Sequence, residues 1–163
     1  MDSLIMGPHW LPMFDDYVFG IGSDGGAFTD LDLLHEARVA RAIGKALTVS
    51  LNYEKTSLNS VILLKALTGW GGSLIGDLVG AVRLGYKADL IILRLDDPRV
   101  VPTYDPVEVV VTALSGREVN DVIIGGKFII KDGYFVEFSE DELLNKVYDV
   151  IPTVMDKLKA LFH

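Results

Sequence analysis

The chain has 163 residues, 50% of them apolar, and a formal charge of -8. This length suffices for one domain that buries most of its unfolded surface, or for two small subdomains. The acidic balance, with Lys and Arg scattered along the chain, argues against binding a nucleic acid through its phosphates. Cysteine is absent, which excludes disulfides and thiolate metal sites and fits a reducing compartment such as the cytoplasm.

Neither a signal peptide nor a membrane span is expected. The N-terminus lacks a basic region followed by an apolar run. The most apolar stretch, Leu58 to Leu84, is interrupted by charges and falls short of the roughly 20 apolar residues that a spanning helix needs. The high mean hydropathy of +0.34 then indicates surface meant for protein contact. The absence of Gln is a hint of a thermophile.

The first elements are a strand, a turn and a helix. Tyr17 to Gly22 (YVFGIG) is an apolar, β-prone run followed by a Gly-rich turn, which predicts a buried strand with a loop at its carboxyl end. Asp30 to Leu47 has apolar residues at helical spacing. Asp24 lies on the turn, where parallel α/β folds gather reactive groups, although an ordinary turn residue is the alternative.

The middle of the chain is predicted to be helical. Ser57 can cap a second helix that runs to about Leu67. Three glycines, Gly69, Gly71 and Gly72, are expected to end it before a short helical turn around Leu74 to Val79. A chain that is helical first and strand-rich later suggests two layers, with a boundary near Arg83 to Lys87.

Strands dominate the second half of the chain, and a helix closes it. Gly125-Gly126 is a two-residue hairpin signal, and Ser139 with Glu142 forms a capping box before a helix with an apolar stripe. Pro152 is expected to kink or split that helix. The predicted strands are Ala88 to Leu95, Val107 to Leu114, Val119 to Ile124 and Lys127 to Ile130.

Five segments in order resemble one family. Gly22-Ser-Asp-Gly25 is similar to a GTDG or GSDG turn, and Asp30 to Arg38 to the helix after it. Val79 to Leu90 is similar to an "iGsle-GkkADlv" segment. Two later segments complete the match: Asp97-Pro98 with Pro102 to Pro106, and Val119 to Lys127 through Gly133. Together they resemble metal-dependent amidohydrolases of the cytosine deaminase, chlorohydrolase and adenosylhomocysteine deaminase group.

The resemblance implies an α/β fold in three parts. Residues 1–84 would be the terminal strand-helix portion of a TIM-barrel metallo-dependent hydrolase. Residues 85–138 would be strands of the small composite β-sandwich domain, and residues 139–163 a C-terminal helical segment. Asp24 would end the eighth barrel strand, complete a Zn or Fe(II) site and exchange a proton with metal-bound water.

The other metal ligands of the family are missing. The family supplies an HxH pair on the first strand and single histidines on the fifth and sixth, and none of these motifs occurs in this chain. Its only histidines are His9, His35 and His163, and none matches a ligand position. A lone carboxylate does not hold such a metal, because catalytic zinc needs about three protein ligands.

Two functions remain open. The chain is either the C-terminal portion of a hydrolase that acts on non-peptide carbon–nitrogen bonds through metal-activated water, inactive alone, or a non-catalytic oligomerising module derived from such an enzyme. The first requires a missing N-terminal barrel half as partner. In both cases the exposed edges and apolar faces of a partial fold predict a homo-oligomer.

Overall fold

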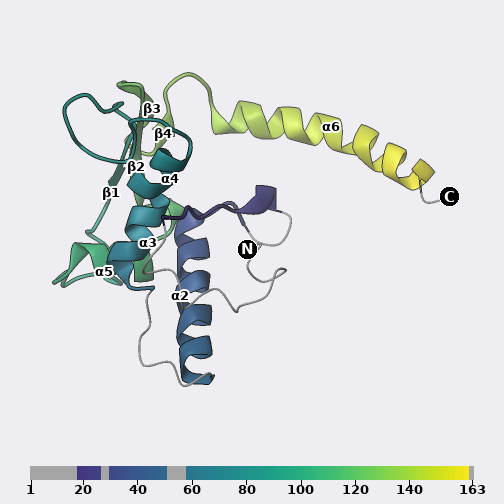
Figure 1. Ribbon diagram of the computed structural model, residues 1–163. Helices are drawn as coiled ribbons and strands as arrows, with labels where there is room; N and C mark the ends of the chain where they lie inside the picture. The colour runs from purple at the N-terminus through teal and green to yellow at the C-terminus, as the bar shows by residue number, and fades with distance from the viewer. Residues whose placement is uncertain (1–17, 27–29, 51–57, 162–163) are drawn as a thin grey trace.

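The computed structural model describes residues 18–26, 30–50 and 58–161. The described chain has a helical layer, a small antiparallel sheet and a projecting C-terminal helix (Figure 1). This confirms the mixed α/β class. The elements are η2 (Asp24–Gly26), α2 (Leu33–Ser50), α3 (Ser60–Leu67), α4 (Gly69–Leu74), β1 (Leu90–Leu93), α5 (Pro106–Thr112), η3 (Gly116–Glu118), β2 (Val119–Ile124), β3 (Lys127–Lys131), β4 (Tyr134–Phe135) and α6 (Glu140–Leu161).

The core lies where α2, α3 and α5 contact one another. Its buried members are Ala37 from α2, Leu63 from α3 and Val111 from α5, with Leu58 just ahead of α3. The helix predicted at Asp30 to Leu47 is confirmed as α2, with its start three residues later. The predicted second helix is α3, but Asn59 caps it; the proposed cap Ser57 lies outside the described residues.

The strand predicted at Val107 to Leu114 is wrong, because this segment forms α5. Its run of valines has β propensity, but the residues before it favour a helix start. The Asp105 carboxylate accepts hydrogen bonds from the backbone N–H groups of Val107 and Glu108, and Pro106 occupies the first turn. The face that carries Val111 then packs on α3. Capping and burial outweigh β propensity here.

The second helix ends at Leu67, as predicted, but the glycines after it form a further helix, α4, so the short helical turn predicted around Leu74 to Val79 is misplaced. Close packing explains why glycine is needed. A Cβ on Gly72 would lie 2.4 Å from a methyl of Val79, and a Cβ on Gly80 2.4 Å from the backbone N of Gly69. Gly80 also has φ +77, which favours glycine.

The strand predicted at Tyr17 to Gly22 is not formed in its described part, residues 18–22. A strand requires backbone pairing with a neighbour, and the sheet of the described chain consists of β1 to β4 only. The burial of the segment still alternates as in a strand. Phe19 and Ile21 pack on the helical core, whereas Val18, Gly20 and Gly22 are exposed. A Cβ on Gly20 would nevertheless lie 3.5 Å from the Cα of Gly71, so Gly20 also borders the helical layer.

The sheet has the order β1-β2-β3-β4 with antiparallel neighbours. β1 is shorter than predicted, whereas β2 and β3 confirm the predicted strands. Gly125 and Gly126 have φ of 57 and 80, so both central residues of the hairpin turn are left-handed, as a type I′ turn requires. No strand residue is buried in the described chain.

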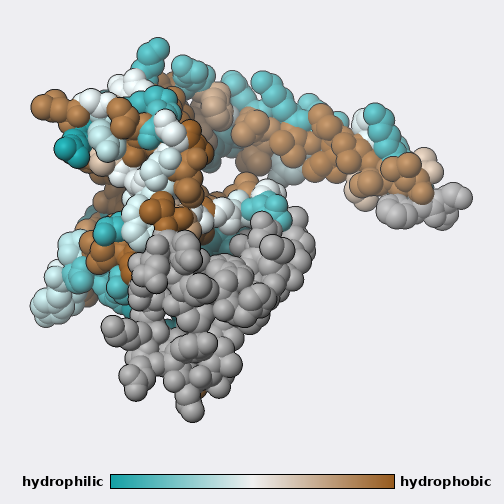
Figure 2. Space-filling view, viewed as in Figure 1, coloured by the Kyte–Doolittle hydropathy of each residue, from teal (hydrophilic) through white to brown (hydrophobic). Residues whose placement is uncertain are grey.

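The C-terminal helix is confirmed as α6, which runs unbroken through Pro152, so the predicted split does not occur. It projects away from the helical layer and the sheet (Figure 1), and none of its residues is buried. Its apolar side chains form a continuous band along the helix (Figure 2). No helix in the described part of the chain has the length and apolarity needed to cross a membrane.

Candidate functional site

Asp24 opens the short turn η2, directly after the half-covered segment 18–22. Its backbone is left-handed, with φ 50, and that of Gly25 follows with φ 70. Asp tolerates this region better than most residues because its short side chain can bond locally. The Asp24 side chain is exposed. The turn thus presents a carboxylate at the carboxyl end of a strand-like segment, as the sequence predicted.

The helix after this turn is tied to a distant loop. Oδ1 of Asp32 accepts hydrogen bonds from the backbone N of Leu34 at 2.9 Å and of His35 at 3.3 Å, which caps α2. The other oxygen, Oδ2, accepts from the backbone N of Gly116 at 3.0 Å. One turn further, the Arg38 guanidinium donates to the carbonyl oxygen of Leu114. These contacts fix the start of α2 against the connection between α5 and β2.

His35 lies on the first turn of α2 and pairs with Asp30. Its Nδ1 is 3.3 Å from both carboxylate oxygens of Asp30. The pKa of Asp30 is lowered, first by a hydrogen bond from the backbone N–H of Asp32 and then by the His35 side chain. Both side chains are largely exposed. This arrangement is that of a surface pair beside a helix start.

The described residues do not form a metal site. Within 18–26, 30–50 and 58–161, no three His, Asp or Glu side chains are grouped so that they could hold an ion. His9 and His163 lie outside the described residues. Asp24 offers one oxygen ligand group, and zinc needs about three from a protein. The residues present therefore do not fit the metal that the resemblance implies.

A polar cluster that sequence reasoning missed joins the three core helices. Arg41 of α2 donates to the Ser60 hydroxyl at 3.0 Å and pairs with the Glu108 carboxylate at 2.7 Å; the Ser60 hydroxyl donates to Glu108. The pKa of Glu108 is lowered, first by Ser60 and then by Arg41. Because Ser60 and Glu108 are 48 positions apart, no local pattern announces the contact.

The structure defines a mixed α/β fold, and similarity to known proteins identifies its family. Residues 12–129 match the Amidohydrolase family, well over half of the chain. The chain belongs to the amidohydrolase family. It is 29% identical over 143 residues to 5-methylthioadenosine/S-adenosylhomocysteine deaminase 1 of Syntrophus aciditrophicus, covering 86% of this chain and 31% of the relative. The 5'-deoxyadenosine deaminase of Methanopyrus kandleri is 31% identical over 76% of this chain and 28% of its own length.

Solved structures agree on the fold. An adenosine deaminase from Xanthomonas campestris with bound zinc matches at a TM-score of 0.71 and 24% identity, over 78% of this chain and 28% of its own. The triazine hydrolase of Arthrobacter aurescens matches at 0.73 and 21% identity, over 92% of this chain and 34% of its own. The chain thus spans about a third of the length of the proteins that it matches.

Proposed function

We propose that this chain is the C-terminal portion of an amidohydrolase that hydrolyses carbon–nitrogen bonds in a nucleoside-like substrate, and that Asp24 is its contribution to the catalytic centre. The observation that carries the proposal is the place of Asp24, on a left-handed turn between a strand-like segment and a capped helix. Several relatives are named as adenosine-type deaminases, which supports the substrate class.

The helical cover of segment 18–22 supports its place as a barrel strand. In a (β/α)₈ barrel each strand pairs on both sides, and its helix covers the outside. Here the helical layer covers Phe19 and Ile21, as an outer ring of helices would. The sheet of the described chain, β1 to β4, does not include this segment. The proposed partner of this chain is accordingly the N-terminal barrel half, which would carry the remaining metal ligands.

The proposal also gives a role to the three parts of the chain. Residues 1–84 would close the barrel, residues 85–138 would form strands of the composite domain, and residues 139–163 would be an appended helix. The hydrogen bonds from Gly116 to Asp32 and from Arg38 to Leu114 join the first part to the second. They would hold the Asp24 turn in a fixed relation to the composite domain.

The test is to rebuild the enzyme from two pieces. The 5-methylthioadenosine/S-adenosylhomocysteine deaminase of Halothermothrix orenii is 33% identical over 134 residues. Its N-terminal part, ending where this chain begins to match, is to be co-expressed with this chain. We expect a complex that carries zinc and releases ammonia from 5-methylthioadenosine, whereas this chain alone does neither.

Asp24→Asn should abolish ammonia release by the complex, because an amide cannot accept a proton as a carboxylate does. Asp30→Asn is the matched control, since Asp30 is another exposed acid between the turn and α2 and should leave activity near the unsubstituted level. Equal activity of the two variants would refute the role of Asp24. A complex without activity would refute the deaminase assignment.

A second candidate is the non-catalytic oligomerising module. The observation that favours it is α6, a long helix with an exposed apolar band. A stable oligomer of this chain alone, with no affinity for the barrel half, would support the module over the enzyme portion.

A further inference from the structure

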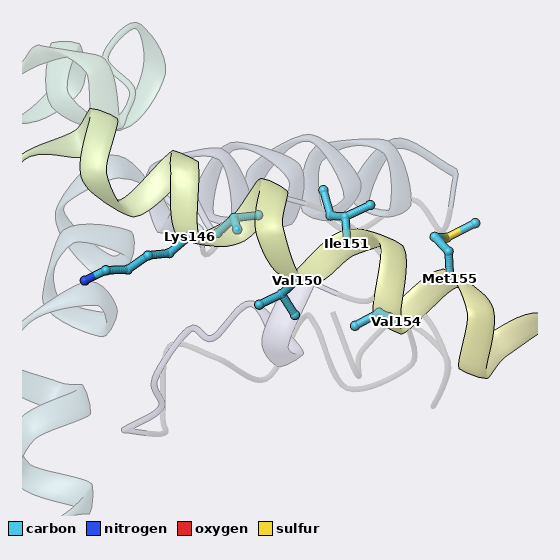
Figure 3. A pocket seen from close by; sticks show the side chains of 6 residues that line it. Lys146, Val150, Ile151, Val154 and Met155 are labelled. Atoms are coloured by element: carbon cyan, nitrogen blue, oxygen red, sulfur yellow. The ribbon is translucent and has the colours of Figure 1, made fainter.

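Helix α6 carries an apolar seam that nothing in the described chain buries. The seam residues follow one another at intervals of three and four, and their exposures run from 43% to 78%. An apolar hollow of about 390 Å³ lies along the helix between Lys146 and Met155 (Figure 3). We give the name α6 seam to the six residues at these intervals: Leu144, Val147, Ile151, Val154, Leu158 and Leu161.

The width of the apolar surface decides what kind of partner it fits. In a two-stranded coiled coil the positions beside the seam are usually charged, because they form ion pairs at the edge of the contact. Beside the α6 seam stand Tyr148, Val150 and Met155, which are 48% to 63% exposed. A face this broad is typical of a helix that packs on a globular surface. This argues against simple pairing with the α6 of a second copy.

The triazine hydrolase match takes in part of α6. It covers 92% of this chain, so the unmatched remainder is shorter than α6, which has 22 residues. The chain of that hydrolase is about three times as long as the matched part. Part of the projecting helix therefore has a counterpart in a chain that is much longer than this one. Figure 1 shows α6 extending to the same side of the helical layer as the turn that holds Asp24.

We infer that the α6 seam docks onto the N-terminal barrel half of the amidohydrolase, against the apolar surface of its outer helices, in a one-to-one complex. The inference rests on the proposed function and adds to it the surface that holds the two parts together. Two observations carry this inference: the broad apolar face of α6, and the triazine hydrolase match, which takes in part of this helix. The alternatives, a second copy of this chain or no docking at all, are outcomes of the test.

The chain contains no cysteine, so one introduced cysteine gives a single labelling site. Ile151→Cys places a spin label on the seam, and Asp149→Cys places one on an exposed polar position of the same helix. The partner is the N-terminal part of the Halothermothrix orenii relative. We expect the Ile151→Cys label to lose mobility when the partner is added and the Asp149→Cys label to stay mobile.

A variant that leaves the fold intact checks the affinity. Ile151→Glu should weaken the complex by at least about tenfold, because a carboxylate would be buried in an apolar contact. Asp149→Glu should leave the affinity unchanged. Since no α6 residue is buried in this chain, neither variant should unfold the remainder.

The outcomes separate this inference from the proposed function. An active complex in which the Ile151→Cys label stays mobile overturns the docking surface and leaves the proposed function standing. A label immobilised in this chain alone, with twice the mass in solution, assigns the seam to a second copy and overturns the inference. If no complex forms at all, the proposed function fails first and the docking surface fails with it.

Discussion

The core helices and α6 use the same helical pattern but end in opposite states. In α3, Leu63 is completely buried and packs with Ala37 and Val111 of its neighbours. In α6, Leu144 has a similar place on an apolar stripe, yet it is 48% exposed. Both helices were predicted from local sequence signals, a capping residue in each case and an apolar stripe in the second. Whether an apolar face becomes core depends on what the rest of the chain places against it.

The difference shows which part of this chain buries its own apolar side chains. The helical layer is closed by apolar burial and by the polar cluster of Arg41, Ser60 and Glu108. Helix α6 has the composition of a packed helix without a packing surface. An exposed apolar face of this size indicates an interaction surface. Substitutions in the two regions test this contrast, beginning with the largest effect.

Leu63→Ala should destabilise the chain most. The side chain is 0% exposed, and removing a buried isobutyl group and leaving a cavity costs about 2–5 kcal/mol. Val61→Ala on the same helix is the control, because Val61 is 52% exposed and should change the free energy of unfolding by less than about 1 kcal/mol. Urea denaturation followed by circular dichroism measures both. Equal losses would mean that α3 does not form the core.

Much of the fold could be predicted from sequence where the signal is local. α2, β2, β3 and α6 follow from spacing and turn residues. The prediction of a strand at 18–22 was wrong, because β propensity alone does not supply the backbone pairing that a strand requires. At Asp105-Pro106 a helix-start signal was present, but the valines after it drew the prediction toward a strand.

The candidate site divides in the same way. Asp24 could be picked out from the sequence, because glycines and an acid after an apolar run form a local pattern. The contacts that hold its surroundings were not, because Asp32 bonds to Gly116 and Arg38 to Leu114 across more than 70 positions. Such contacts depend on how helices and loops meet in space.

Glu118→Gln should cost less than the core substitution and depend on pH. Glu118 is 7% exposed, and it accepts hydrogen bonds from the Ser115 backbone N at 2.7 Å, the Ser115 hydroxyl at 2.8 Å and Arg99 at 2.6 Å. These contacts lower its pKa below 4.5, with the Ser115 backbone bond the largest cause. Gln would turn a donor toward one of these donors, at a cost of about 1.5–3 kcal/mol.

The sign of the pH effect follows from the lowered pKa. The carboxylate stabilises the fold above its unfolded pKa, and this contribution is lost as pH falls below 4.5 through the folded pKa. The difference in urea midpoint between the parent chain and Glu118→Gln should therefore be largest near neutral pH and shrink in acid. A difference that grows on acidification would contradict the assignment.

Arg41→Ala should cost about 1 kcal/mol, because its ion pair with Glu108 is only partly shielded from solvent. The Arg41 side chain is 17% exposed, and its Nε is buried without a hydrogen-bond partner. Arg41→Met keeps the stem and removes that unpaired group, so it should lie closer to the parent chain than Arg41→Ala. The free energy of unfolding of the two variants measures the balance. Equal losses for the two variants would show that the charge matters more than the stem.

Leu144→Ala in this chain alone should change the free energy of unfolding by less than about 0.5 kcal/mol, because the side chain contributes to no core. Applied to the complex with the barrel half, the same substitution should raise the dissociation constant by about tenfold or more, since a covered leucine loses roughly 1.5–3 kcal/mol of burial. The two measurements, urea denaturation and titration calorimetry, make the comparison between helices quantitative. A substantial loss in the isolated chain would show that α6 already packs there, which would remove the contrast between the two regions.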